Sequence, residues 1–174
     1  MKLSKFFLPV VVGFLVCGLA VFVAARSFQF PNMQLRPEKG TQIVSGNLKI
    51  SGLGKSLSLA DFEGKVIVLN FWATWCPPCV SEMPHFVAIS NAYPKDVVVI
   101  GISLDDDIAP VVSFLQKHNI TYPVGMMNDG FSETFGNLPG IPATFILDRN
   151  RHLVKRVVGY QSFTDVDALI KPYL

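Results

Sequence analysis

Cysteine, histidine and charged residues are all scarce in this chain. Its 174 residues include three cysteines and three histidines, and only 16% of them are charged. The formal net charge is +2 and no run of lysine and arginine occurs, so the basic patch of a nucleic-acid-binding protein is missing. Three cysteines, of which Cys17 lies in an apolar run, do not supply the disulfide framework of a small secreted domain.

Internal repeats and low-complexity tracts are also absent from the sequence. Half of the residues are apolar, which argues against disorder along the whole chain. The length suits one domain with an ordinary core, together with a short additional segment.

The additional segment lies at the N-terminus, where residues 6–25 contain no charged side chain and Arg26 closes the run. At about 1.5 Å per residue, such a helix spans a hydrocarbon core of about 30 Å. We therefore expect an uncleaved N-terminal transmembrane helix over residues 1–26. Val23-Ala24-Ala25 leaves a cleaved signal peptide as the alternative. Basic residues on both sides of the run leave its orientation open.

Residues 27–40 are predicted to be a linker, and residues 41–174 the main domain. Continuous apolar runs in this domain predict buried strands, and apolar residues at helical spacing predict helices. The predicted strands are 66–72, 97–102, 122–126, 143–147 and 152–158, the predicted helices are 80–92, 108–118 and 162–173, and a strand or hairpin within 41–51 and a helical turn within 130–135 complete the pattern. The alternation is typical of an α/β sheet with crossover connections.

Polar residues precede two of these helices. Asp105 to Asp107 come before the helix 108–118, and Ser162 or Thr164 lies at the start of the last helix, so both are candidates for N-caps. The adjacent carboxylates indicate a metal site only weakly, because carboxylates before a helix commonly cap it.

Cys76 and Cys79 lie where the predicted strand 66–72 meets the helix that follows it. The first sulfur is then placed at a helix N-terminus, where backbone amides and the helix dipole favour a thiolate. The second lies on the same helical face and can attack a mixed disulfide formed at the first. Pro77 and Pro78 suit a first turn, where their missing N–H groups would be unpaired anyway. This pattern predicts a redox-active disulfide.

Other uses of a C-x-x-C pair fit this chain less well. Haem attachment needs a histidine directly after the second cysteine, and that position is Val80. A structural zinc site needs a second pair of ligands, of which His85 would supply only one. We therefore expect redox catalysis with no metal and no other cofactor.

Two motifs, in order and separation, resemble the TlpA/ResA/CcmG (DsbE) branch of thioredoxin-like proteins. The first is Asn70-Phe71-Trp72-Ala73-Thr74-Trp75-Cys76-Pro77-Pro78-Cys79 with Glu82-Met83-Pro84, and the second is Gly140-Ile141-Pro142-Ala143-Thr144-Phe145-Ile146-Leu147-Asp148. The resemblance runs from about Leu57 to the end of the chain. It implies a thioredoxin-like fold, with a central mixed sheet flanked by helices. It also implies a thiol–disulfide oxidoreductase anchored in the inner membrane by a single helix, with its domain on the periplasmic, extracytoplasmic side.

The resemblance further implies roles for single residues. Cys76 matches the exposed nucleophile and Cys79 the buried resolving thiol. Glu82 matches an acidic residue that relays a proton, and a solvent-facing helical glutamate is the alternative. Asn70 departs from thioredoxin, which has an aspartate here. Because asparagine does not exchange a proton at neutral pH, this departure gives Glu82 more weight.

Four further residues are expected to bind the substrate. Pro142 matches a cis-proline that follows Ile141, lies beside the dithiol and helps to dock an extended substrate strand. Trp75 is expected to shield the dithiol face, with simple packing as the alternative, and Pro77 lies between the two cysteines. Phe71 and Trp72 are interpreted as core.

Several members of this branch reduce apocytochrome cysteines, so the resemblance implies protein disulfides, including those of apocytochrome c, as substrates. A membrane thiol–disulfide reductase is the implied electron donor. The direction also follows from the residues, because Pro77 and Pro78 remove two amide donors and no lysine or arginine flanks the cysteines. A thiolate stabilised so weakly favours a reductant, nearer in potential to thioredoxin (about −270 mV) than to a strong oxidant (about −120 mV).

Two other functions stay open at this point. Peroxiredoxin-type peroxidases share the fold, but their Pro-x-x-x-Thr-x-x-Cys motif meets Leu69 and Ala73 here at the proline and threonine positions. Related metal-binding chaperones have a C-x-x-x-C motif with a distant histidine, whereas the two cysteines here are separated by one residue fewer. Peroxide consumption and metal titration of the reduced protein separate these functions from thiol–disulfide exchange.

Overall fold

The computed structural model describes residues 49–52, 56–127 and 134–174. The chain divides into two units, Met1–Asn32 and Met33–Leu174, and all described residues belong to the second. The predicted anchor over 1–26 and linker over 27–40 therefore lie outside the described residues. Within the described part, no helix has the length and apolar character needed to cross a bilayer.

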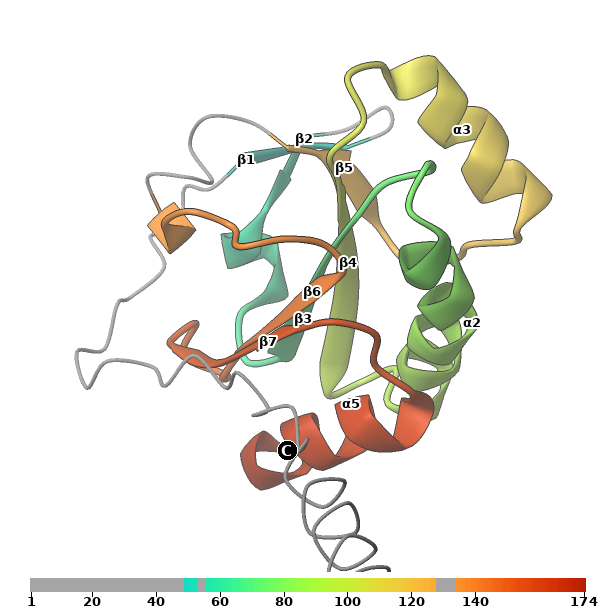
Figure 1. Ribbon diagram of the computed structural model, residues 1–174. Coiled ribbons are helices and arrows are strands. Elements are labelled where there is room, and N and C mark those ends of the chain that lie inside the picture. Colours follow the sequence, from blue (N-terminus) through green and yellow to red (C-terminus); the bar gives the residue numbers. More distant parts are fainter. Residues whose placement is uncertain (1–48, 53–55, 128–133) are drawn as a thin grey trace, which may run out of the picture. The chain divides into compact units, whose positions relative to one another are not determined.

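The described strands form one sheet in the order β2-β1-β5-β4-β3-β6-β7 (Figure 1). They are β1 (Lys49–Gly52), β2 (Ser56–Ser58), β3 (Val66–Trp72), β4 (Val97–Ser103), β5 (Val124–Met126), β6 (Ala143–Leu147) and β7 (Leu153–Val158). Strands β3, β4 and β5 run parallel, and the other pairs are antiparallel. The predicted mixed sheet and the hairpin β6–β7 are confirmed.

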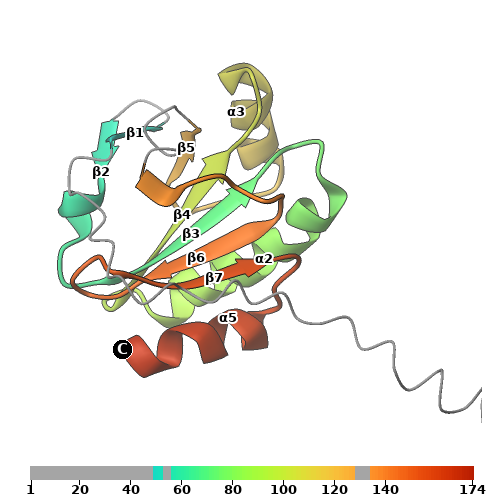
Figure 2. The ribbon, with the colours of Figure 1, turned by 60° about the vertical axis from the view of Figure 1, so that its left-hand side comes forward.

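Helices α2 (Pro77–Ala92), α3 (Ile108–Lys117) and α5 (Phe163–Ile170) contribute to one buried cluster on one face of the sheet. Two successive right-handed crossovers, β3–α2–β4 and β4–α3–β5, move in the same direction along the sheet and so place both helices on the same face. Figure 2 shows α5 beside α2. The short 3₁₀ helix η1 (Leu59–Phe62) contributes to the cluster on the other face.

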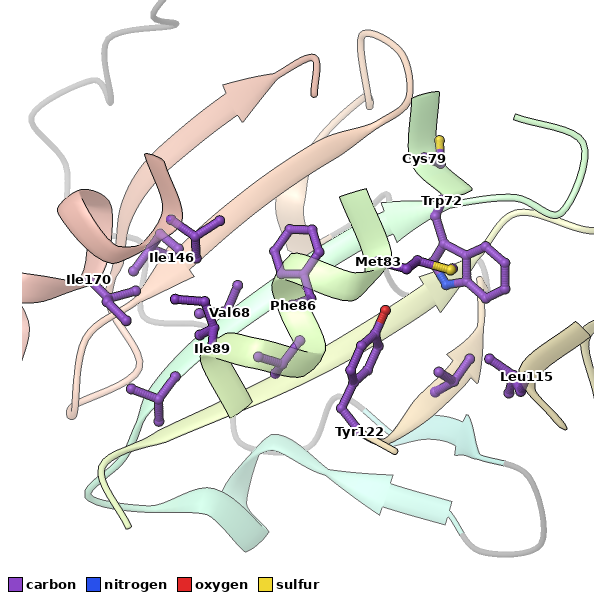
Figure 3. Close-up of a cluster of buried hydrophobic side chains, with 14 of the residues drawn as sticks. Val68, Trp72, Cys79, Met83, Phe86, Ile89, Leu115, Tyr122, Ile146 and Ile170 are labelled. Carbon is purple, nitrogen blue, oxygen red and sulfur yellow. The ribbon is translucent and has the colours of Figure 1, made fainter. Parts of the chain in front are cut away.

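Strand β3 is buried along its whole length, as the apolar run predicts. Its side chains alternate between the two faces: Val68 and Trp72 belong to the cluster under α2, and Phe71 to the cluster opposite. Figure 3 shows Trp72, Met83 and Phe86 in the first cluster. The interpretation of Phe71 and Trp72 as core is confirmed.

The helices begin close to where the sequence predicts them, with one correction. Asp107 occupies the N-cap position of α3, but its side chain makes no capping hydrogen bond. The prediction that Asp105 to Asp107 cap this helix is therefore wrong for the side chains. Ser162 does cap α5, through a reciprocal pair of hydrogen bonds with Asp165, and the 3₁₀ helix η2 (Lys171–Tyr173) follows α5.

Two predicted elements are only partly covered. The hairpin of β1 and β2 overlaps the strand or hairpin expected within 41–51, of which residues 41–48 lie outside the described residues. The helical turn expected within 130–135 falls mostly on residues 128–133, which also lie outside them.

Candidate active site

The two cysteines of the C-x-x-C pair are joined in a disulfide at the start of α2, with their Cα atoms 5.3 Å apart. Cys76 is the N-cap residue, and Cys79 is three residues along the helix. Cys76 keeps 5% of its surface exposed whereas Cys79 keeps none. A reagent in solution therefore reaches the sulfur of Cys76 first, although neither side chain is broadly exposed.

The first turn of α2 offers few donors to a thiolate. Pro77 and Pro78 occupy its first two positions and carry no N–H group. The N–H of Val80 donates to the carbonyl of Cys76, and the N–H of Cys76 donates to Ala73. In the described structure, this leaves the N–H of Cys79 as the first-turn donor that is not bound to a carbonyl.

Glu82 lies on the second turn of α2 and is completely buried. Its Oε1 accepts a hydrogen bond from Asn70 Nδ2 (2.7 Å), and its Oε2 accepts one from the backbone N–H of Gln161 (2.9 Å). Burial raises the pKa of the Glu82 carboxyl from 4.5 to about 7, although the hydrogen bonds from Gln161 and Asn70 act in the opposite direction. The alternative of a solvent-facing glutamate is wrong.

Two strands under α2 contribute to the surroundings of Glu82: β3 carries its hydrogen-bond donor Asn70, and β4 carries Gly101, which has no side chain. Asn70 on β3 is paired with Gly101 on β4. Both positions face α2, because residues two positions away in each strand belong to the cluster under α2. A Cβ atom at Gly101 would lie 3.0 Å from Trp72 Nε1 and 3.2 Å from Tyr122 Cε2. A side chain at this position would therefore displace the rings of Trp72 and Tyr122.

Asp105 holds the turn that leads into the dithiol. Its carboxylate accepts hydrogen bonds from the backbone N–H of Thr74 (3.0 Å), the Thr74 hydroxyl (2.6 Å) and the Ser103 hydroxyl (2.7 Å). The register explains this contact: Trp72 pairs with Ser103 at the ends of β3 and β4, so Thr74 and Asp105 lie two residues beyond paired positions. Sequence reasoning assigned Asp105 to a cap and missed this role.

The residues expected to bind substrate lie at the start of α2 and in the loop before β6. Trp75 is 67% exposed beside the dithiol, which rules out simple packing, and Pro77 is also exposed. The peptide bond between Ile141 and Pro142 is cis, as predicted, and the carbonyl of Pro142 accepts a hydrogen bond from Gly159 N–H (2.8 Å). Ile141 packs against the cluster that contains both cysteines.

The histidines contact other side chains of the described structure, with His85 bound to Tyr160. His118 stacks on Phe114, and His152 Nδ1 lies 3.2 Å from Asp148 Oδ2. Among residues 49–52, 56–127 and 134–174, no group of three His, Cys, Asp or Glu side chains is placed to hold a metal ion.

A redox disulfide at a strand-to-helix turn, above a mixed sheet and with a cis-proline loop, defines a thioredoxin-like thiol–disulfide oxidoreductase. The thiol-disulfide oxidoreductase ResA of Bacillus thuringiensis subsp. konkukian (strain 97-27) is 27% identical over 175 residues, covering 98% of each chain. ResA of Bacillus cereus (strain ATCC 10987 / NRS 248) is 32% identical over 120 residues, covering 68% of this chain and 69% of the relative.

A solved structure agrees with these relatives. The thiol:disulfide interchange protein of the thioredoxin family from Chlorobium tepidum TLS is 29% identical and superposes with a TM-score of 0.64, covering 72% of this chain and 94% of that one. Residues 29–170 match the Redoxin family. The chain belongs to this family, and its curated relatives are ResA-type thiol–disulfide oxidoreductases.

Proposed function

We propose that this chain is a reductant of protein disulfides, anchored in the inner membrane by residues 1–26 through the linker 27–40. Its domain, 41–174, faces the periplasmic, extracytoplasmic side. The observation that carries the direction of transfer is the scarcity of donors in the first turn of α2, where two prolines leave one free amide. A thiolate that is weakly stabilised makes the dithiol a willing electron donor.

The buried carboxylate of Glu82 supports the same direction. With a pKa of about 7 it is partly ionised at neutral pH, and it lies one turn along α2 from Cys79. A negative charge there disfavours a second negative charge on a nearby sulfur. The dithiol form therefore gives up its electrons more readily than one beside a cation would.

The reaction proceeds in two exchanges that conserve atoms and electrons. The Cys76 thiolate attacks one sulfur of the substrate disulfide, which forms a mixed disulfide and releases one substrate thiolate. Cys79 then loses its proton and attacks the sulfur of Cys76, which forms the Cys76–Cys79 disulfide and releases the second substrate thiolate. Two electrons pass to the substrate, and both substrate thiolates take up protons.

Glu82 is the proton acceptor for Cys79 in this scheme. A general base works best when its pKa lies near the operating pH, and burial brings the pKa of Glu82 to about 7. Its two hydrogen bonds, from Asn70 and Gln161, fix the carboxylate in position.

Substrate docking is assigned to the start of α2 and to the loop before β6. The exposed ring of Trp75 and the exposed Pro77 offer an apolar surface beside Cys76. Ile141 and Pro142 provide the edge on which an extended substrate strand lies. The resemblance to the TlpA/ResA/CcmG branch supports apocytochrome c as a substrate and a membrane thiol–disulfide reductase as the donor that restores the dithiol.

A peptide with the sequence C-x-x-C-H, oxidised to its disulfide, tests the proposal directly. We expect the reduced full chain to reduce this peptide faster than it reduces glutathione disulfide. Equilibration with a glutathione buffer should give a potential nearer about −270 mV than about −120 mV. A potential close to the second value would overturn the assignment as a reductant.

The anchor has its own test. The full chain should stay in the membrane fraction after a high-salt wash, and an impermeant label should reach its domain from outside. Recovery of a soluble protein that begins at Arg26 would show instead that the segment is a cleaved signal peptide.

A further inference from the structure

The segment from Gly159 to Ser162, between β7 and α5, contacts α2 at two neighbouring points. Inside, the backbone N–H of Gln161 donates to Glu82 Oε2 (2.9 Å). Outside, the Tyr160 hydroxyl forms a hydrogen bond with His85 Nε2 (2.7 Å), and the two rings pack edge to face. The inner contact is buried, whereas Tyr160 is 46% exposed.

These two contacts join the same two segments. Tyr160 and Gln161 are adjacent in sequence, and His85 follows Glu82 by three residues, which is about one turn of α2. The surface bond therefore holds the backbone that carries the buried donor. The ends of the segment are also fixed, because Gly159 N–H donates to the carbonyl of Pro142 and Ser162 caps α5.

We propose that His85 and Tyr160 form a surface latch that positions the Gln161 amide on the Glu82 carboxylate, and so controls proton transfer between Glu82 and the dithiol. Both are positioning residues, since neither touches the sulfurs in this arrangement. The second half of the proposal rests on the role of Glu82 in the proposed function. The first half concerns the carboxylate alone.

The latch matters because Glu82 depends on few donors. The side-chain amide of Gln161 donates back to the carbonyls of Gly159 and Tyr160, so the backbone N–H is what this residue offers to Glu82. If the segment loosens, Asn70 is the donor that remains. A carboxylate that loses a backbone donor is harder to ionise, so its pKa rises.

Other titratable groups face this region and must be kept constant. Tyr122 faces Glu82 from the residues before β5, where burial first and the charge of Glu82 second raise the pKa of its hydroxyl. Asp165 of α5 faces His85, although its hydrogen bonds with Ser162 are the main cause of its lowered pKa. A variant that changes only the latch hydrogen bond leaves both groups in place.

Tyr160→Phe is that variant, since it removes one hydroxyl from an exposed ring. The full chain has four glutamates, so selective carbon-13 labelling gives a carboxyl spectrum in which the Glu82 signal is identified by its loss in Glu82→Gln. We expect Tyr160→Phe to raise the titration midpoint of Glu82 by about half a pH unit. The pH profile of thiol alkylation in the reduced protein should move upward by the same amount.

Tyr93→Phe is the matched control. Its hydroxyl donates to Asp167, so it also joins the end of α2 to α5, but at the far end from Glu82. We expect no change in the Glu82 titration in this variant. His85→Ala removes the same hydrogen bond together with the ring contact, so it should shift the Glu82 midpoint in the same direction. Adding Tyr160→Phe to it should shift the midpoint no further.

The outcomes separate the two halves of the proposal. An unchanged Glu82 midpoint in Tyr160→Phe, or an equal shift in Tyr93→Phe, would overturn the latch. A Glu82 midpoint that moves while the alkylation profile stays fixed would support the positioning role and overturn the role of Glu82 as proton acceptor for Cys79.

Discussion

The first and second turns of α2 differ in how many hydrogen-bond donors they offer to a negatively charged group. The first turn carries the sulfurs but places prolines at two of its donor positions, whereas the second turn buries a carboxylate that receives two hydrogen bonds. The hydrogen-bond donors of the site therefore bind the Glu82 carboxylate and not the sulfur of Cys76. In the function proposed above, the two turns divide the reaction, with electrons carried at the first and a proton held at the second.

The largest effect is expected from replacing the cysteines of the first turn. Cys76→Ser should lower disulfide reduction to the background rate, because the attacking sulfur is lost. Cys79→Ser should instead accumulate a mixed disulfide at Cys76, which a non-reducing gel would show and a reducing agent would remove. A mixed disulfide that accumulates at Cys79 in Cys76→Ser, with none at Cys76 in Cys79→Ser, would reverse the assigned roles of the two thiols.

Glu82, in the second turn, should make the free energy of unfolding depend on pH. The pKa of Glu82 is raised from 4.5 to about 7, so between these values the folded protein keeps a proton that the unfolded chain has lost. Stability should therefore fall as pH rises through this window, by about 3 kcal/mol at about 1.4 kcal/mol per pH unit.

Glu82→Gln should remove this dependence, because glutamine is neutral at both ends of the window. Urea unfolding of the oxidised protein at pH 4.5 and at pH 7.5 measures the difference between the two proteins. If both proteins show the same dependence on pH, the carboxyl of Glu82 ionises at an ordinary pKa and the contrast between the two turns disappears.

A smaller effect is expected where the entry to the first turn is held. Asp105→Ala removes the acceptor of two hydrogen bonds from Thr74 and one from Ser103, and it should cost about 2 kcal/mol of unfolding free energy. The neighbouring exposed Asp106 supplies the control, since Asp106→Ala should stay within about 0.5 kcal/mol of the parent. Equal losses in both variants would show that the contact with Thr74 contributes little.

The sequence predicts the first turn better than the second for a physical reason. The strand 66–72, the turn and the start of α2 are contiguous, so local apolar patterning and the two prolines determine them. Thioredoxin-like redox chemistry was therefore predictable from one stretch of chain. The cis bond at Pro142 was predictable only through the resemblance, because a proline alone does not determine its isomer.

The second turn depends on contacts that sequence spacing does not reveal. Gln161 reaches Glu82 across 79 residues, and Asp105 reaches Thr74 across 31. The first of these contacts uses a backbone N–H, which leaves no trace in the identity of the side chain. The second becomes predictable once the pairing of β3 with β4 is known, because the register alone brings the two residues together.

The smallest effect should come from restoring one donor to the first turn. Pro78 is exposed and occupies the second position of α2, so Pro78→Ala adds an N–H group close to the sulfur of Cys76 without disturbing the core. Donors at a helix N-terminus stabilise a negative charge by about 0.3–1 kcal/mol. Stabilising the thiolate favours the reduced form, and about 1.4 kcal/mol corresponds to about 30 mV in this two-electron couple. The potential should become about 6–20 mV less negative.

Pro84→Ala adds an N–H to the same helix further from the sulfurs and should leave the potential unchanged. A shift of equal size in both variants would mean that the prolines act through the helix as a whole, and not through the donors that the first turn lacks.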